Sequence, residues 1–378
     1  MIKQLVFLNR ISVDPLLVLA ILPILFAGLM TMNSFMADQY YLDRQLIWIA
    51  ASFLVFFLAS MVDWRFLRRS GVVATIYIGG LAMLLVVALA GQVTRNVESW
   101  LSFGGVSVQP AEFMKLVMII ILAKYFSRRH IEIANIRHII LSGAYAFIPF
   151  ALVALQPDFG SALIIFAIWL GMTMVSGISL KHLGLVFLVG SLSFGALWGL
   201  VFADYQKERI KTFIHPLADI RGSGYNAFQS MVAVGSGEIF GKGVGYGTQS
   251  RLQFLPEHQT DFIFAAFAEE WGYVGVLLFF LLFGIVIWRI VATSILGATN
   301  FEILFGLGLA IFLMAHFIIH VGMNIGILPV TGLPVPFLSY GGSHLLTVFL
   351  GLGILMGMRR YANPFHRDDM HNEFIGPR

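Results

Sequence analysis

The sequence predicts an all-α integral membrane protein with about ten transmembrane helices. Of its 378 residues, 58% are apolar and only 12% are charged, and the mean hydropathy is +0.86. A typical water-soluble domain carries about twice that share of charged residues. Apolar runs of about 18 residues or more, each enough to cross roughly 30 Å of hydrocarbon, recur along the whole chain. We therefore interpret residues 1–378 as a single polytopic membrane domain.

Ten apolar runs define the predicted helices. The first follows Lys3 and Arg10 and is interpreted as a retained anchor, because no small-residue cleavage site comes after it. The fourth is the least apolar, since Glu112 and Lys115 lie within it. The runs begin near Pro15, Gln45, Val72, Ala111, Ile139, Phe159, His182, Asp261, Phe301 and Ser339.

Basic residues in the short loops predict the orientation of the chain. The segments "DWRFLRRS" (63–70) and "KYFSRRH" (124–130) lie on the side of the N-terminus, whereas short loops on the other side contain only Arg44 and Arg95. Because cytoplasmic loops carry an excess of Lys and Arg, both termini are predicted to be cytoplasmic. The formal net charge of +4 suits contact with anionic lipids and is too small to predict nucleic acid binding.

Polar segments gather on the opposite, extracytoplasmic side. The segment 204–260, between helices seven and eight, is too long for a bare connector and is predicted to have structure of its own. It contains a predicted interfacial amphipathic helix over 204–216. It also contains a glycine-rich stretch, 232–250, whose backbone amides can approach an anion and which includes the candidate binding residue Lys242. The other polar segments are 98–115, 156–161 and 324–344. This one-sided arrangement favours an enzyme at the outer leaflet, because a transporter needs polar groups at mid-membrane.

Carboxylates surround the start of the eighth run. Asp261 is either a helix N-terminal acid stabilised by the helix dipole or a general base at the membrane edge. Glu257 and Thr260 flank it as supporting candidates. Glu269 and Glu270 follow about 12–14 Å further along the helix. A charge near the centre of a span costs about 2.5–3.5 kcal/mol, so at least one of these two acids is predicted to be paired or protonated.

Two further sites with carboxylates allow alternative interpretations. Glu112 and Lys115 share a helix face three residues apart. They are either a self-neutralising pair or a phosphate-binding lysine with the acid that positions it. Asp158, in "QPDFGS", is most simply a helix N-cap.

The segment 324–344 is rich in proline and glycine, which indicates irregular backbone inside the protein or beside water. His316 and His320, four residues apart, could hold a metal ion, but a third ligand is lacking and helix packing is the simpler interpretation. No metal ligand set is therefore predicted, although a divalent cation such as Mg²⁺ or Mn²⁺ remains open. The candidate hydrogen-bonding residues of the segment are Asn324, Thr331, Ser339 and Tyr340.

Taken together, these motifs resemble the SEDS family (shape, elongation, division, sporulation) over essentially the whole chain. The most specific are "GKGVGYGTQSRLQFLPEHQTDFIFAAFAEEWGYVG" (241–275) and "GMNIGILPVTGLPVPFLSYGGSH" (322–344), with "QPAEFMK" and "QPDFG" in support. The resemblance implies a peptidoglycan glycosyltransferase of the bacterial cytoplasmic membrane. It would polymerise lipid II, a lipid-linked sugar, at the outer face by an inverting reaction.

The resemblance also implies roles for particular residues. The family's essential aspartate falls on Asp261, its acid and lysine after "QP" on Glu112 and Lys115, and its "QPD" aspartate on Asp158. Asp261 would be the general base, Lys115 would stabilise the leaving pyrophosphate, and the apolar helices would hold the polyprenyl chains. The chain departs from the family pattern in three places, at Gln259 (with His258 one position early), Ser99 and Glu238.

The resemblance implies a partner, a class B penicillin-binding protein with transpeptidase activity. Small residues on the ninth run, Gly306, Gly308 and Ala310, predict a surface on which a partner helix docks. Motif wording favours the elongation and rod-shape branch over a division-specific paralogue. The alternatives from other classes are a lipid II flippase, which needs a polar path through the bilayer, and a scaffold for cell-wall assembly.

Overall fold

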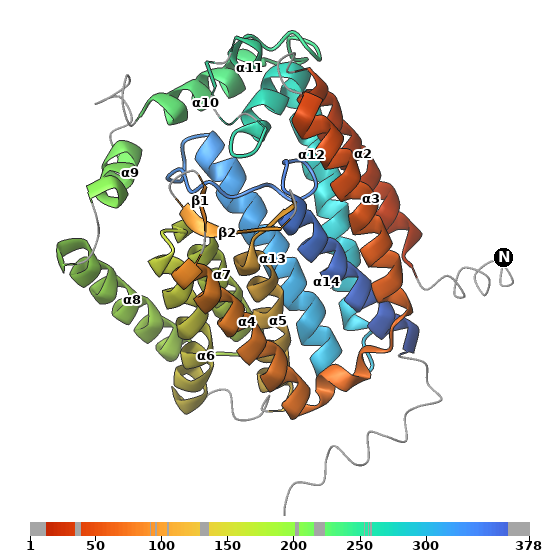
Figure 1. Cartoon of the computed structure of the whole chain (residues 1–378), viewed down its shortest axis with the longest axis vertical. Coiled ribbons are helices and arrows are strands. Elements are labelled where there is room, and N and C mark those ends of the chain that lie inside the picture. The colour runs from red at the N-terminus through yellow and green to blue at the C-terminus, as the bar shows by residue number, and fades with distance from the viewer. Residues whose placement is uncertain are drawn as a thin grey trace, which may run out of the picture.

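The computed structural model describes residues 13–34, 39–90, 92–94, 97–103, 106–128, 136–200, 204–214, 224–252, 254–255, 257 and 259–361. The chain forms a helical bundle (Figure 1). The long helices are α2 (Pro15–Asn33), α3 (Gln39–Met61), α4 (Ser70–Ala90), α5 (Pro110–Ser127), α6 (Ile136–Leu155), α7 (Phe159–Val175), α8 (Leu180–Leu200), α12 (Ile263–Ile295), α13 (Asn300–Asn324) and α14 (Gly342–Tyr361). The shorter ones are η1 (Trp64–Arg68), α9 (Asp204–Ile214), α10 (Tyr225–Ser236) and α11 (Thr248–Arg251).

Helices occupy all ten predicted positions, and this confirms the all-α membrane fold. Among the described residues, seven helices are long and apolar enough to cross a membrane, namely α2, α3, α4, α6, α12, α13 and α14. The other three are less simple spans: α5 carries Glu112 and Lys115, α7 has 17 residues, and the apolar part of α8 is Leu180–Leu192. The number of membrane crossings and their orientation therefore stay predictions.

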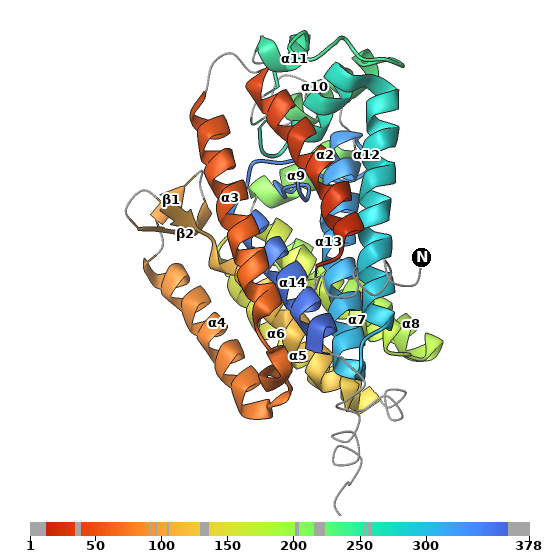
Figure 2. The same ribbon diagram turned by 90° about the vertical axis from the view of Figure 1, so that its right-hand side faces the viewer.

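Helices α5 and α13 lie at the centre of the bundle. Helix α13 packs against α5, α7 and α12, while α14 packs along α3 and α12 along α2 (Figures 1 and 2). We call the end of the bundle that carries α10, α11 and the start of α12 the α10 end, and the opposite end, which carries η1, the η1 end. The predicted structure within 204–260 is present as α9, α10 and α11.

A small antiparallel sheet precedes α5, and the sequence analysis did not predict it. Its strands, β1 (Gln92–Thr94), β2 (Val97–Phe103) and β3 (Val106–Val108), pair in chain order. Phe103 pairs with Val106, so only Gly104 and Gly105 join β2 to β3. A Gly-Gly pair is a strong signal for a two-residue hairpin, but the segment was interpreted as a polar connector.

Helix α12 is broken at Gly272, where φ is 66° and ψ is −169°. The break frees backbone groups, and the glycine-rich loop satisfies them: Lys242 N–H donates to Glu269 O and Gly243 N–H donates to Glu270 O, each at 3.0 Å. In return, Tyr273 N–H donates to Glu238 O at 3.0 Å. The backbone of residues 238–243 therefore supplies hydrogen-bond partners on both sides of the break.

The predicted partner surface on α13 is wrong, because Gly306, Gly308 and Ala310 are all buried. An ideal Cβ on Gly306 would lie 1.8 Å from Ser294 Oγ, and one on Gly308 would lie 2.8 Å from Ile119 Cγ2. Both glycines therefore face the interior. They allow α13 to approach α12 and α5 within the chain, as small residues do in membrane bundles.

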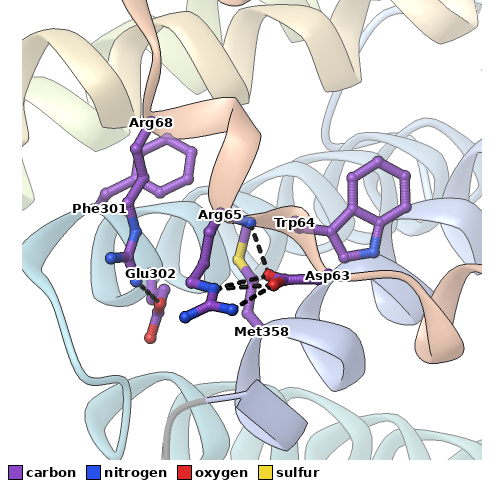
Figure 3. Close-up of a pocket in the computed structure, with 7 residues that line it drawn as sticks. All are labelled: Asp63, Trp64, Arg65, Arg68, Phe301, Glu302 and Met358. Atoms are coloured by element: carbon purple, nitrogen blue, oxygen red, sulfur yellow. Dashed lines mark hydrogen bonds and ion pairs between the residues drawn. The ribbon is translucent and has the colours of Figure 1, made fainter. Parts of the chain in front are cut away.

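Carboxylates pair with the basic residues of the η1 end. Arg68 forms an ion pair with Glu302, which joins η1 to the first turn of α13 (Figure 3). Asp63 accepts hydrogen bonds from Arg65, and these bonds hold the pKa of the carboxyl below its ordinary value. Asp14, the N-cap of α2, accepts from Arg289 Nε at 2.9 Å. These pairs fix the ends of four helical elements relative to one another.

We expect Gly272→Ala to destabilise the fold. A Cβ there would lie 2.1 Å from Gly241 N, and the residue has a positive φ that costs an L-residue about 1–3 kcal/mol. The matched control is Gly284→Ala in the same helix, where nothing lies within 4 Å of the new Cβ. Thermal unfolding in detergent should show a lower midpoint for Gly272→Ala and an unchanged or higher one for Gly284→Ala. Equal unfolding midpoints for the two variants would contradict the close packing of residues 238–243 against the break in α12.

Candidate active site

Asp261 lies in the turn that precedes α12, at the α10 end, and is partly buried. The N-cap of α12 is Phe262, and the N–H of Ala265 is satisfied by Asn324 Oδ1 at 3.2 Å. Asp261 is therefore not the residue that caps this helix. Its own N–H donates to Glu257 O at 3.0 Å, so the turn Glu257–Asp261 presents the side chain just outside the helix.

The loop between α13 and α14 forms the surroundings of this turn. Ser339 Oγ donates to Thr260 O at 3.0 Å and accepts from Val335 N–H at 2.9 Å. Tyr340 N–H donates to Gln259 O at 3.0 Å. Burial raises the pKa of the Tyr340 phenol, which packs edge-on against Tyr41 with ring centroids 5.0 Å apart. The two segments that the sequence identified are thus joined by direct hydrogen bonds.

Gly332 brings the backbone of this loop against the Asp261 side chain. Its φ is +72°, and an ideal Cβ would lie 3.4 Å from Asp261 Oδ2. Asn324, at the end of α13, donates from Nδ2 to Asp261 O at 3.1 Å. Thr331, the preceding loop residue, contacts Met323 Sδ through its N–H and hydroxyl, each at 3.5 Å. Asn324, Ser339 and Tyr340 therefore all contact the turn Gln259–Asp261. Thr331 instead contacts Met323 of α13.

Lys115 is fully buried and lies inside a polar cluster. Its ammonium donates to Glu112 Oε1 at 2.6 Å and lies 3.3 Å from His316 Nε2. His344 Nδ1 lies 2.9 Å from the other oxygen, Glu112 Oε2. This burial favours the first of the two interpretations of Glu112 and Lys115, a pair that neutralises itself within the protein.

The same cluster has the ligand types of a metal site. Glu112, His316 and His344 each offer one ligand atom, and these atoms lie within 4.8 Å of one another. However, the ammonium of Lys115 already uses Glu112 Oε1 and the His316 Nε2 lone pair. A cation in that position would meet like charge, so the donor set does not fit a resident metal ion.

Asp158 is the N-cap of α7, as predicted. Its Oδ1 accepts from Ser161 N–H at 2.9 Å, and its Oδ2 accepts from Gln109 Nε2 at 2.7 Å. Gln109 is itself the N-cap residue of α5. Asp158 therefore joins the starts of two helices close to the loop, since a Cβ on Gly160 would lie 2.7 Å from Thr331 O.

The prediction that at least one of the two acids is paired is confirmed by Glu269. Glu269 is fully buried, and its Oε1 accepts from Lys242 Nζ at 2.7 Å and from Thr248 N–H and Oγ1, each at 2.9 Å. Gln249 N–H donates to Oε2 at 3.1 Å. The anion that the glycine-rich amides approach is thus a carboxylate of the chain itself. Lys242 is engaged with that carboxylate, and its role toward substrate stays a prediction.

Glu270 points the opposite way, toward α2. It accepts from Gly245 N–H at 3.1 Å and from the Ser34 hydroxyl. Its second oxygen is buried without a partner among the described residues.

Most of the chain matches a known family. The family model for FtsW, RodA and SpoVE, described as cell cycle protein, matches residues 8–364. The chain belongs to this family. This confirms the SEDS resemblance on which the predicted roles of Asp261, Glu112 and Lys115 rest.

Relatives whose names give different cellular roles are similarly close. The peptidoglycan glycosyltransferase MrdB of Escherichia coli is 32% identical over 356 residues, which cover 94% of this chain and 95% of the relative. Stage V sporulation protein E of Bacillus subtilis is 32% identical over 364 residues, 94% and 99% of the two chains. The probable peptidoglycan glycosyltransferase FtsW of Haemophilus influenzae is 33% identical over 328 residues, 84% and 80% of the two.

Solved structures of the family agree with the fold. A chain from a peptidoglycan synthase complex, studied for the coordination of polymerisation and crosslinking, has a TM-score of 0.81 at 28% identity and covers 93% of this chain and 100% of its own. The rod shape determining protein RodA of Thermus thermophilus has a TM-score of 0.70 at 27% identity, with 93% and 99% covered. A variant of that RodA, with an aspartate replaced by alanine, gives the same TM-score at 28% identity.

The three departures from the SEDS pattern fall in different surroundings. Glu238 has a φ of 48°, a left-handed conformation that glycine adopts more easily, which explains why the family pattern has glycine there. Gln259 is buried and accepts from Tyr340 through its backbone, whereas His258 lies outside the described residues. Ser99 lies on β2.

Several residues that complete the site lack a signal in the sequence strong enough to predict their contacts. His344 reaches Glu112 from a position 232 residues away, and no local pattern indicates that contact. Gln45 Nε2 donates to Ser339 O at 3.2 Å and Gln109 contacts Asp158, both from segments interpreted as span or connector. A polar residue inside or at the edge of an apolar run was the available signal, because such residues need a partner within the protein.

We expect Glu269→Gln to loosen the glycine-rich loop of this SEDS protein. The amide keeps the shape but loses the charge that the donors of Ser236, Lys242, Thr248 and Gln249 share. A hydrogen bond to a charged group contributes about 1.5–3 kcal/mol. Amide exchange at Thr248 and Gln249 should become faster, as hydrogen-exchange mass spectrometry would show. The control is Glu208→Gln in the exposed pair Glu208–Lys211, where little change is expected. Unchanged exchange at Thr248 in Glu269→Gln would show that the carboxylate does not order the loop.

Proposed function

We propose that this chain is a peptidoglycan glycosyltransferase that polymerises lipid II at the outer face of the bacterial cytoplasmic membrane. The observation that carries the proposal is the position of Asp261, a partly buried carboxylate outside the first turn of α12, with the Gly332 backbone beside it. The names of the relatives MrdB and FtsW support the reaction class.

In the proposed reaction Asp261 is the general base. Its carboxylate takes the proton from the acceptor sugar hydroxyl, whose oxygen then forms a bond to the anomeric carbon of the growing chain. The bond from that carbon to the pyrophosphate breaks, the polyprenyl pyrophosphate leaves with the electron pair, and the configuration inverts. A positioned carboxylate contributes typically 10²–10⁴-fold to such a proton transfer.

An apolar groove supports a lipid-linked substrate. It has a volume of about 470 Å³ and is lined by α7, α12 and α13 side chains, among them Ala310 and Ile319. From Ile319 to Leu307 the groove follows α13 for about 18 Å at 1.5 Å per residue. Ile319 lies about one turn below Asn324, which contacts Asp261. A polyprenyl chain in this groove would run along α13 with one end toward the α10 end of the bundle, where Asp261 lies.

We assign the chain to cell elongation, with a class B penicillin-binding protein as partner. The wording "GTQSRLQFLPE" (247–257) supports the elongation branch, and the peptidoglycan synthase complex among the structural neighbours supports a crosslinking partner. This assignment requires that the chain restores rod shape in cells depleted of RodA and does not restore division in cells depleted of FtsW.

The partner should raise the polymerisation rate when titrated into the purified protein. A rate that does not change with partner concentration would exclude an activating role.

Asp261→Asn should abolish polymerisation, because the amide is nearly isosteric but cannot take the proton. We expect the rate to fall at least 100-fold, measured by gel analysis of glycan made from purified lipid II. Glu208→Gln, an acid on the exposed face of α9, is the control and should keep the wild-type rate. A general-base role is excluded if Asp261→Asn retains more than about a tenth of the rate while the thermal unfolding midpoint is unchanged.

The proposed orientation is tested by labelling single cysteines, since the chain contains none. Lys211→Cys lies on α9, in the loop assigned to the outside, and Ala298→Cys lies in the turn between α12 and α13, at the η1 end. Only the first should react with an impermeant maleimide in intact cells, and both should react after lysis. Labelling of Ala298→Cys alone in intact cells would reverse the orientation and place Asp261 on the cytoplasmic side.

A further inference from the structure

Three polar residues lie one turn apart on α13, and the proposed function does not use two of them. His316, His320 and Asn324 are each fully buried, and residues spaced by four share one face of a helix. The sequence singled out the two histidines as a possible metal pair. The structure gives each of the three a different and specific contact with the segments around Asp261.

The contacts form a ladder along α13. His316 Nδ1 lies 3.0 Å from Pro334 O, and His320 Nδ1 lies 2.6 Å from Leu333 O. Asn324 Nδ2 donates to Asp261 O at 3.1 Å. Because a carbonyl oxygen only accepts, both histidines must carry a proton on Nδ1. Successive turns of one helix therefore hold two successive carbonyls of the loop and the backbone of the Asp261 turn.

Lys115 determines which tautomer His316 adopts. An ammonium only donates, and Lys115 Nζ lies 3.3 Å from His316 Nε2, so this nitrogen must accept. The ring is then neutral, with its proton on Nδ1 and directed at Pro334 O. Glu112 holds Lys115 in place at 2.6 Å.

The carbonyls held by the histidines adjoin the wall beside the carboxylate. Gly332, whose Cβ would lie 3.4 Å from Asp261 Oδ2, directly precedes Leu333. The other end of the loop is tied to the same turn through Ser339 and Thr260. Movement of Leu333 or Pro334 would therefore change the space next to Asp261.

We propose that His316 and His320 are positioning residues that hold the Gly332–Pro334 backbone against Asp261. Lys115 acts through His316, by fixing its tautomer, and does not contact the leaving pyrophosphate. This inference rests on the proposed role of Asp261. A displacement of about 1 Å at a reacting group can cost about 100-fold in rate, so the effect belongs in kcat rather than KM.

The test compares His320→Leu with His320→Asn. Leucine removes the donor, whereas the asparagine amide nitrogen lies close to the position of Nδ1 and keeps it. We expect kcat for lipid II polymerisation to fall about 100-fold in His320→Leu with KM nearly unchanged, and to recover largely in His320→Asn. Equal losses in the two variants, or a loss confined to KM, would overturn the positioning role.

Two substitutions of His316 separate its contact with Pro334 O from its contact with Lys115. His316→Asn keeps the donor to Pro334 O, and His316→Gln keeps an acceptor for Lys115 but loses that donor. His316→Asn should be the more active variant. Replacing both Glu112 and Lys115, by Gln and Met, should then cost less in the His316→Asn background than in the wild type, because asparagine has no tautomer to fix. Additive losses would contradict the role assigned to Lys115.

Hydrogen exchange supplies a readout that does not depend on activity. The amides of residues 328–341 should exchange faster in His320→Leu and at the wild-type rate in His320→Asn. If Asp261→Asn proves active, the general-base proposal fails, while the exchange result still decides whether the histidines hold the loop. Should His320→Leu not fold, the His316→Asn and His316→Gln pair, in which both variants stay polar, gives the same comparison. Wild-type exchange and kcat in the donor-lacking variants would refute the inference.

Discussion

The buried ammonium of Lys115 is the interaction on which the centre of the bundle depends. A charge inside a membrane protein must be paired within the chain, because the bilayer offers it no hydrogen-bonding partner. The partners of Lys115 come from α5 and α13, and those of Glu112 include His344 of α14. Helix α5 must therefore meet α13 and α14, which lie about 170 residues or more further along the sequence, in one arrangement. Removal of one member leaves a buried charge unpaired, which costs more than the pair itself contributes.

The same constraint explains the α10 end of α12. Breaking a helix inside an apolar bundle exposes carbonyls and amides, and the chain meets this requirement with the backbone of residues 238–243. Glu269 then collects donors from Lys242, Thr248 and Gln249. These polar groups, whose burial without a partner would be unfavourable, thus connect the glycine-rich loop to the bundle by hydrogen bonds. Asp261 lies at the edge of this region, where the loop, the turn and the end of α13 meet.

The features that were predicted correctly from the sequence each have a signal within a short stretch of residues. Long apolar runs identified the helices, a proline followed by Asp158 identified the N-cap, and the spacing of Glu112 and Lys115 identified their pairing. Contacts between distant segments had no such signal. The approach of Gly241 to Gly272, and the inward direction of Gly308, depend on which helices become neighbours. The role proposed for His320 likewise follows only from the position of Leu333, because the sequence alone does not show which group a buried histidine contacts.

In the proposed function, the break in α12 also accounts for how a membrane-embedded chain would present the Asp261 carboxylate to a lipid-linked sugar. Residues 272–295 rise about 36 Å at 1.5 Å per residue, which exceeds the roughly 30 Å of hydrocarbon in a bilayer. This part of α12 is sufficient to cross the membrane without the first turns, Ile263–Trp271. Those turns are buried against the loops rather than exposed to lipid. Asp261, which precedes them, therefore lies at the α10 end outside the part of α12 that is long enough to cross a membrane, while the apolar groove lies along α13. In the proposed function, the polar turn at Asp261 would take the sugar headgroup and the apolar groove would take the polyprenyl chain.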